Sequence, residues 1–270
     1  MGPLYAPAMS IGSIESIWRY PVKSMRGQEV REGFLSFEGL YGDRIFAFTN
    51  AAGPAGFPYL TAREQGQMVL HRARFKHPER AMHPPNLADA ETISPGVTPI
   101  SADPTDLAVE VETPSGDVFS IDDPRLAERL SEGVGDVSNL SLLRSERAFT
   151  DCRPVSLFSM GTVAQIGEEV GAKVDKLGFR ANLYLNLSSG AGFAENEFVG
   201  RKLRIGDRAE IYVSERDPRC VMITIDPRTA ARNPSVLQKV TKTHGGTAGV
   251  YGAVLTPGRI RPGDPIAFSD

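Results

Sequence analysis

The sequence is poor in cysteine, with only Cys152 and Cys220 among its 270 residues. Two cysteines cannot form the framework of a disulfide-rich secreted domain, and they suit a reducing compartment. The first ten residues, MGPLYAPAMS, lack the basic start and apolar run of a secretion signal, and no later apolar run reaches membrane-spanning length. We therefore expect a cytoplasmic protein without a membrane partner.

The sequence also lacks an excess of basic residues. Charged residues make up 23% of the chain and the formal net charge is −3. No broad basic field is available to hold a nucleic-acid backbone or an anionic membrane surface. We therefore expect a small-molecule substrate and no nucleic-acid partner.

Short β-branched and aromatic runs, broken by Gly, Pro and Asp, predict a mainly β (α+β) fold. The length favours two domains. The segment 71–104 is rich in Pro and small polar residues and predicts a long loop or linker. The expected strands lie at 11–24, 42–50, 68–75, 107–121 and 208–214, and the expected helices at 123–135 and 162–179. For the second helix, Thr162 and Gln165 are the predicted capping box.

The strand periodicity makes predictions about polar side chains. If RCVMITI (219–225) is a strand, Cys220 faces away from the aliphatic layer that contains Val221, Ile223 and Ile225. The same alternation in GFRANLYLNL (178–187) places Arg180 and Asn182 on one face, opposite three leucines. In GDRIFAF (42–48), Arg44 shares a face with Phe46 and Phe48.

The residue pattern alone leaves three interpretations of Cys220 open: a small buried residue, a metal ligand or a sulfur nucleophile. The four histidines show no metal-ligand spacing, and we expect them at the surface: His71, His77, His83 and His244.

Several motifs resemble known domains. FRANLYL, FVGRKLRIGD, RCVMITIDPRT and VYGAVLTPGRIRPGDPI resemble a MOSC domain, as found in molybdenum cofactor sulfurases and amidoxime-reducing proteins. IWRYPVKSM, GDRIFAF and LTARE resemble the β-rich domain that precedes it. The resemblance implies an N-terminal β-rich domain at 11–125, packed on a MOSC β-barrel with a few helices at 126–270. It also associates the domain with pyridoxal phosphate binding.

The resemblance implies a role for individual residues. Cys220 would bind molybdenum through its thiolate and be the catalytic residue, and a soft thiolate suits that metal. The phosphate of the molybdenum cofactor (molybdopterin) would be held by basic and polar side chains. The implied cofactor-binding set is Lys23, Ser24, Arg44, Arg153, Arg180, Asn182 and Arg219. Ala230 stands where the family usually has a glycine after DPRT, so we expect an altered turn there.

The resemblance implies a molybdenum-dependent oxidoreductase that reduces N-hydroxylated compounds of the amidoxime or hydroxylamine type. Two alternatives are sulfur transfer through a Cys220 persulfide and a non-catalytic cofactor-binding protein. The sequence has no dinucleotide fingerprint, no haem-attachment motif and no cysteine set for an iron–sulfur cluster. We therefore expect a separate electron donor, a ferredoxin- or cytochrome-type protein with its reductase.

Overall fold

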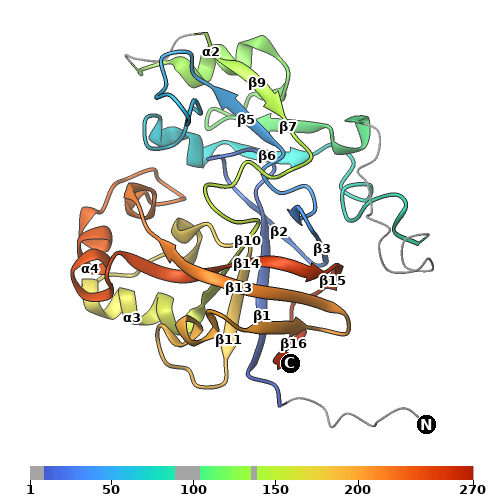
Figure 1. Cartoon of the computed structure of the whole chain (residues 1–270). Coiled ribbons are helices and arrows are strands. Elements are labelled where there is room, and N and C mark those ends of the chain that lie inside the picture. Colours follow the sequence, from blue (N-terminus) through green and yellow to red (C-terminus); the bar gives the residue numbers. More distant parts are fainter. Residues whose placement is uncertain (1–8, 89–103, 135–138, 270) are drawn as a thin grey trace.

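A closed β-barrel forms the lower part of the molecule in the computed structural model, which describes residues 9–88, 104–134 and 139–269 (Figure 1). Seven strands follow one another around the barrel, and the first pairs with the last. In order they are β11 (Leu183–Leu187), β10 (Val155–Ser159), β14 (Thr247–Thr256), β13 (Ala209–Pro218), β12 (Lys202–Ile205), β16 (Pro265–Ser269) and β1 (Gly12–Arg19). A short strand, β2 (Gln28–Val30), extends the sheet beyond β1.

Strand β1 closes the barrel although it comes from the opposite end of the chain. It pairs antiparallel with β11, with Ile17 opposite Leu183, and with β16, with Gly12 opposite Ile266. Ile14 and Ile17 are buried in the barrel core together with residues from the C-terminal strands. The barrel therefore requires both ends of the sequence.

A second β-rich region lies above the barrel (Figure 1). It contains the pair β5 (Phe46–Thr49) and β9 (Ser141–Arg144), and the sheet β6 (Arg72–Phe75), β7 (Val109–Glu112) and β8 (Val118–Ser120). Helix α2 (Pro124–Ser131) and two short 3-10 helices, η1 (Gly66–Leu70) and η2 (Pro104–Leu107), complete it. This region has its own core, in which Phe48, Met68 and Leu126 are buried.

A small sheet connects the two regions. It contains β3 (Gly33–Ser36), β4 (Gly39–Leu40) and β15 (Gly258–Ile260). Strand β15 follows the long barrel strand β14, whereas β3 and β4 come from the N-terminal part of the chain. Pairing of β15 with β3 therefore fastens the barrel to the N-terminal segment.

Helices α3 (Met160–Val170) and α4 (Pro234–His244) cover one side of the barrel (Figure 1). A third core lies beneath them and includes Phe158, Ile166, Tyr184 and Val240. Three further 3-10 helices occur in this half of the chain: η3 (Lys176–Phe179), η4 (Ala194–Phe198) and η5 (Val221–Thr224).

The mainly β fold class is confirmed, while the helix predicted at 162–179 is shorter than expected. Ser159, not Thr162, is the N-cap of α3, and its side chain accepts a hydrogen bond from the Thr162 N–H at 3.1 Å. The helix ends at Gly171, which has a φ of 69°. This left-handed C-terminal residue turns the chain away from the helix axis.

The prediction that the histidines lie at the surface is wrong for His71, which is 6% exposed. Its Nδ1 atom lies 3.1 Å from the Gln67 carbonyl oxygen.

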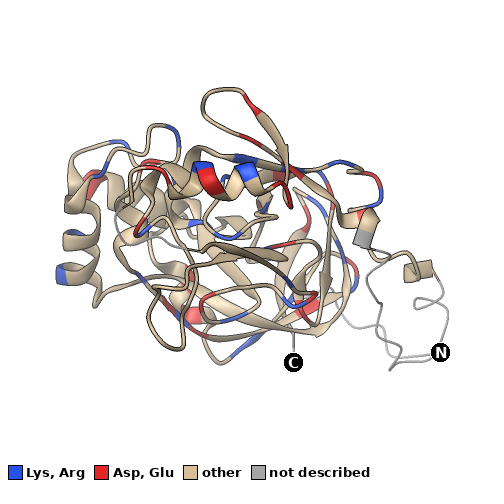
Figure 2. Cartoon of the chain, turned by 90° about the horizontal axis from the view of Figure 1, so that it is seen from above, with Lys and Arg blue, Asp and Glu red and all other residues tan. Residues whose placement is uncertain are grey.

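Strand β6 occupies the start of the loop predicted at 71–104, and residues 89–103 of that loop lie outside the described residues. No helix in the described residues is both long and apolar enough to cross a membrane. Basic and acidic residues are interspersed over the chain (Figure 2).

Replacing Gly39 by alanine is expected to destabilise the contact between the small sheet and the barrel. Gly39 has a φ of 119°, and a Cβ atom there would lie 2.6 Å from the Pro154 carbonyl oxygen. We expect a loss of about 1–3 kcal/mol in the free energy of unfolding, measured by urea denaturation. Gly56→Ala is the matched control, because Gly56 also has a positive φ of 83° but nothing lies within 4 Å of the new Cβ. Equal losses in the two variants would show that the collision with Pro154 is irrelevant.

Candidate functional site

One pocket brings together the loops between the barrel and the second β-rich region. All eight side chains predicted from the sequence line it: Lys23, Ser24, Arg44, Arg153, Arg180, Asn182, Arg219 and Cys220. They come from the segments after β1, before β5, before β10, between η3 and β11, and after β13. The enclosed part of the pocket has a volume of about 90 Å³.

Three of these residues adopt left-handed backbone conformations although none is a glycine. The φ angles are 67° for Ser24, 49° for Arg44 and 56° for Arg180. Arg44 and Arg180 therefore precede strands β5 and β11 instead of lying in them, and the predicted strand alternation does not apply to either residue. Such conformations cost roughly 1–3 kcal/mol each and persist only where the surrounding structure holds them.

The predicted strand at 219–225 is also wrong. Strand β13 ends at Pro218, and the chain then forms the 3-10 helix η5, with Cys220 in extended conformation immediately before it. Cys220 is half-buried and lines the pocket, while Ile223 is buried in the core beside α4. The turn after Pro218, and not strand alternation, therefore directs the thiol to the pocket.

Cys152 is exposed and does not line the pocket, and its sulfur lies 3.8 Å from Glu215 Oε1.

Ala230 keeps a left-handed turn where we expected an altered one. Its φ is 59°, a conformation that glycine adopts at lower cost. The Ala230 N–H donates to the Asp226 carbonyl oxygen at 2.9 Å. The turn after η5 is thus formed despite the missing glycine.

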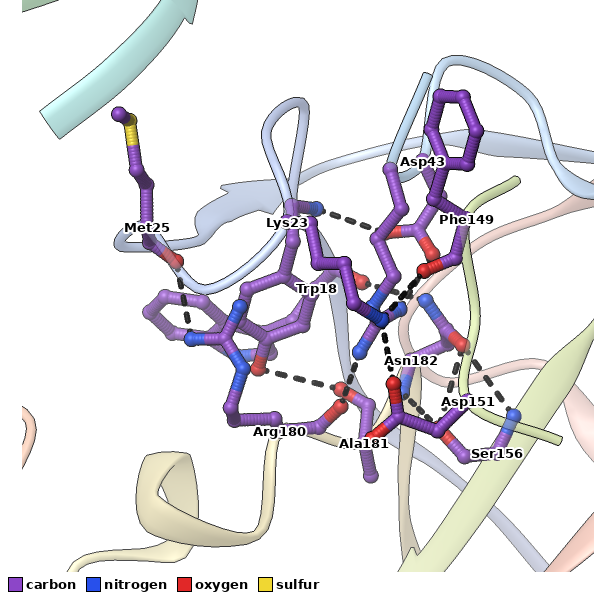
Figure 3. Close-up of polar contacts among 12 residues, drawn as sticks. Trp18, Lys23, Met25, Asp43, Phe149, Asp151, Ser156, Arg180, Ala181 and Asn182 are labelled. Atoms are coloured by element: carbon purple, nitrogen blue, oxygen red, sulfur yellow. Dashed lines mark hydrogen bonds and ion pairs between the residues drawn. The ribbon is translucent and has the colours of Figure 1, made fainter. Parts of the chain in front are cut away.

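Two arginines that line the pocket contact the buried ring of Tyr20. The guanidinium carbons of Arg44 and Arg180 lie 4.7 and 4.4 Å from the ring centroid. Arg180 donates through Nη1 to the Met25 carbonyl oxygen at 2.9 Å (Figure 3), and Arg44 donates to the Arg180 carbonyl oxygen at 2.8 Å. Burial lowers the pKa of Arg180 to about 10. Its Nη2 atom is buried without a hydrogen-bond partner among the described residues, so it remains available to an anion.

Lys23 also lines the pocket. Its Nζ atom donates to the Phe149 carbonyl oxygen at 2.8 Å and to the Asp151 carboxylate (Figure 3). Burial lowers the pKa of Lys23, and the Asp151 carboxylate opposes this shift. Arg63 pairs with the other oxygen of Asp151 at 3.0 Å.

Arg63 was not identified by sequence reasoning, although it lies in the quoted motif LTARE. It lines the pocket beside Cys220, and its Nε atom is buried without a partner among the described residues. Burial acts to lower the pKa of Arg63, but Cys220 and Asp151 outweigh this effect, so that the pKa is raised. Only the tertiary structure brings this arginine to Cys220, so no spacing in the sequence could have revealed it.

Other predicted residues are already engaged within the protein. Arg219 donates to the Ala248 carbonyl at 2.7 Å and to the Phe179 carbonyl at 2.9 Å, and it pairs with Asp217 at 2.7 Å. The guanidinium group of Arg219 therefore holds the segment that contains Cys220. Similarly, the Asn182 side chain accepts from the Ser156 N–H at 3.2 Å and donates to the Trp18 carbonyl oxygen at 3.3 Å. Arg153 is half-exposed and pairs with Glu215 at 2.7 Å.

The balance of charges makes the pocket electropositive. Six basic and two acidic side chains line it, and the buried Arg63 Nε and Arg180 Nη2 atoms have no hydrogen-bond partner among the described residues. In contrast, no group of three or more His, Cys, Asp or Glu side chains is arranged to hold a metal ion within the described residues. The arrangement can thus bind a phosphorylated or otherwise anionic ligand next to a single thiol.

Along most of its length the chain is similar to known proteins. The chain is 22% identical to mitochondrial amidoxime-reducing component 1 of Mus musculus over 302 residues, covering 95% of this chain and 82% of that protein. It is 28% identical to the molybdenum cofactor sulfurase of Drosophila grimshawi over 274 residues, covering 92% of this chain but only 33% of the sulfurase. The crystal structure of the YUAD protein from Bacillus subtilis matches 94% of this chain and 93% of its own, with 13% identity and a TM-score of 0.44.

Two family models account for most of the sequence. The MOSC N-terminal beta barrel domain matches residues 11–116, and the MOSC domain matches residues 144–267. The second match contains Cys220 together with Arg153, Arg180, Asn182 and Arg219, and the first contains Lys23, Ser24, Arg44 and Arg63. The chain thus belongs to the MOSC-domain proteins that carry an N-terminal MOSC-type β-domain.

Proposed function

We propose that this protein is a molybdenum-cofactor-dependent reductase of N-hydroxylated compounds, with Cys220 as the protein ligand to the metal. The observation that supports it is the convergence of one half-buried thiol and six basic side chains in a single pocket. The similarity to amidoxime-reducing components supports the choice of substrate class.

The pocket residues fit an anionic pterin cofactor. Lys23, Arg44 and Arg180 would hold its phosphate, and the unpaired Nη2 of Arg180 is a ready hydrogen-bond donor to it. Cys220 would hold the metal through its sulfur, the soft type of ligand that molybdenum accepts. When bound, the cofactor would supply the two-electron chemistry that removes oxygen from an N–hydroxyl group.

Binding would require local movement. A ligand pocket usually measures roughly 300–1,000 Å³, whereas the enclosed part of this one measures about 90 Å³. Asp151 fills part of the space by pairing with Lys23 and Arg63. We therefore infer that the Asp151 carboxylate would move away from Lys23 on binding, so that Lys23 Nζ could contact a phosphate.

Turnover is expected to require an external electron donor protein of the ferredoxin or cytochrome type, because the chain carries no recognisable redox motif of its own. With a simple amidoxime as substrate, the cofactor-loaded protein should be active with a reduced viologen and inactive with NADH or NADPH alone. Formation of the amidine product measures both reactions. Steady turnover with a nicotinamide alone would contradict the donor requirement, and inactivity with both reductants would contradict the reductase proposal.

Sulfur transfer is a second candidate, favoured by the similarity to a molybdenum cofactor sulfurase over 92% of the chain. In that reaction Cys220 would carry a persulfide. Analysis of the purified protein separates the candidates: molybdenum and pterin near one per chain support the reductase or a cofactor carrier, whereas cyanide-labile sulfur without metal supports sulfur transfer. Turnover with viologen then distinguishes the reductase from the carrier.

A further inference from the structure

Asp217 lies at an irregular point in the pairing of β13 with β14, where its side chain lines the pocket. Arg216 is opposite Val250 and Pro218 is opposite Thr247, so Asp217 faces two residues of β14. The extra residue is therefore on β14, as in a β-bulge of that strand. Asp217 is 2% exposed and lines the pocket that contains Cys220, so an acidic group is buried where the reaction would occur.

The partners of Asp217 connect it to the pocket wall. Its Oδ2 atom lies 2.7 Å from Arg219 Nη2, and its side chain is hydrogen-bonded to that of Tyr251 on β14. Tyr251 also lines the pocket but is only half-buried. Because a phenol can both accept and donate a proton, Tyr251 connects the buried carboxyl group to the more accessible part of the pocket.

The surroundings make the carboxyl group of Asp217 easier to protonate than that of an exposed aspartate. Burial raises the pKa of Asp217 to about 6, although the charge of Arg219 opposes the shift. Burial also raises the pKa of Tyr251, so its hydroxyl stays protonated. The other charged or titratable groups that act on this pair are Arg44, Asp151 and Cys152.

Reduction of an N–hydroxyl group consumes protons as well as electrons. An amidoxime takes up two electrons and two protons, the N–O bond breaks, and an amidine and one water molecule are formed. The other acidic side chain of the pocket, Asp151, is unsuited to donate: burial favours its protonated form, but Lys23 and Arg63 outweigh this effect and lower its pKa. The arginines of the pocket are too basic to exchange protons near neutral pH.

We propose that Asp217 donates a proton to the leaving oxygen of the N–hydroxyl substrate and is reprotonated through the hydroxyl of Tyr251. The two electrons come from the external donor named above, and the leaving oxygen departs as water. The second proton, which the amidine nitrogen takes up, comes from solvent. This inference rests on the proposed reductase function, but Asp217 protonation can be measured without it.

The first test is infrared titration of the purified protein. The carbonyl band of a protonated carboxyl group should grow as pH falls from 8 to 5, with a midpoint near 6, and should be missing from Asp217→Asn. Exposed Asp117 provides the matched control, because Asp117→Asn should retain the band. A band that persists in Asp217→Asn would overturn the proposal, as would a wild-type midpoint near that of an ordinary aspartate.

The second test is the pH dependence of viologen-driven amidoxime reduction. In the wild type, kcat should fall as pH rises above about 6, because the carboxyl group loses its proton. Asp217→Asn should lower kcat by roughly 100-fold or more, with molybdenum content unchanged. The decrease of kcat with rising pH should be missing from this variant. Tyr251→Phe should lower kcat less, since solvent can still reach Asp217 more slowly.

The outcomes separate this inference from the proposed function. A wild-type protein without amidoxime reductase activity would contradict the function, whatever the infrared titration shows. An active wild type and an Asp217→Asn variant with the same pH profile would overturn the proton-donor role alone. Loss of activity with the wild-type profile preserved would mean that Asp217 only positions Arg219.

Discussion

Cys220→Ser is expected to abolish amidoxime reduction and to remove most of the bound molybdenum. A serine hydroxyl is a much harder ligand than a thiolate and is protonated at neutral pH. No cluster of three His, Cys, Asp or Glu side chains in the described part of the chain could take over metal binding. Metal analysis by mass spectrometry and viologen-driven turnover measure the two effects.

The fold should survive this substitution. Cys220 is half-buried, and its side chain makes no capping hydrogen bond to η5, so the free energy of unfolding should change by only about 0.5 kcal/mol. Cys152→Ser is the matched control, because Cys152 is exposed and lies outside the pocket lining. Wild-type metal content and turnover in Cys220→Ser would exclude Cys220 as the ligand.

Arg180→Ala should reduce cofactor occupancy strongly. Removal of a charge-assisted hydrogen bond to phosphate costs about 1.5–3 kcal/mol, which corresponds to roughly 10- to 150-fold weaker binding. Titration of the cofactor-depleted protein with isolated cofactor, followed by pterin fluorescence, measures the change. Lys23→Ala should act in the same direction, since Lys23 lines the same pocket.

Two further variants make the Arg180 result interpretable. Arg180→Lys keeps the positive charge but loses the planar fork, so it should bind the cofactor with intermediate affinity. Arg129→Ala, on the exposed face of α2, should bind like the wild type. Because Arg180 also packs on Tyr20 and donates to Met25, urea denaturation of each variant must accompany the titration. Unchanged affinity in both Arg180→Ala and Lys23→Ala would place the phosphate elsewhere.

The sequence by itself determined the β-rich character of the chain and the group of residues around the pocket. Alternating apolar residues indicate strands with one buried face, and frequent Gly and Pro residues indicate turns. Because both signals are local, the mainly β fold could be inferred from them. The resemblance of the motifs around Lys23, Arg44, Arg180 and Cys220 to those of MOSC proteins predicted that these residues meet, and they line one pocket. Local pattern could not reveal their backbone geometry, because the left-handed conformation of Arg44 and Arg180 depends on contacts with distant segments.

Only the tertiary structure decided which of these residues are available to a ligand. Arg219 has the same side chain as Arg180, yet it donates to Phe179 and Ala248 and its Nη2 atom forms an ion pair with Asp217, whereas Arg180 Nη2 has neither kind of partner among the described residues. Likewise, Asp217 lines the pocket at an irregular point in the pairing of β13 with β14, and β1 closes the barrel by pairing with strands from the far end of the chain. These features arise from non-local pairing and from competition for hydrogen-bond partners, which periodicity along a single chain does not record.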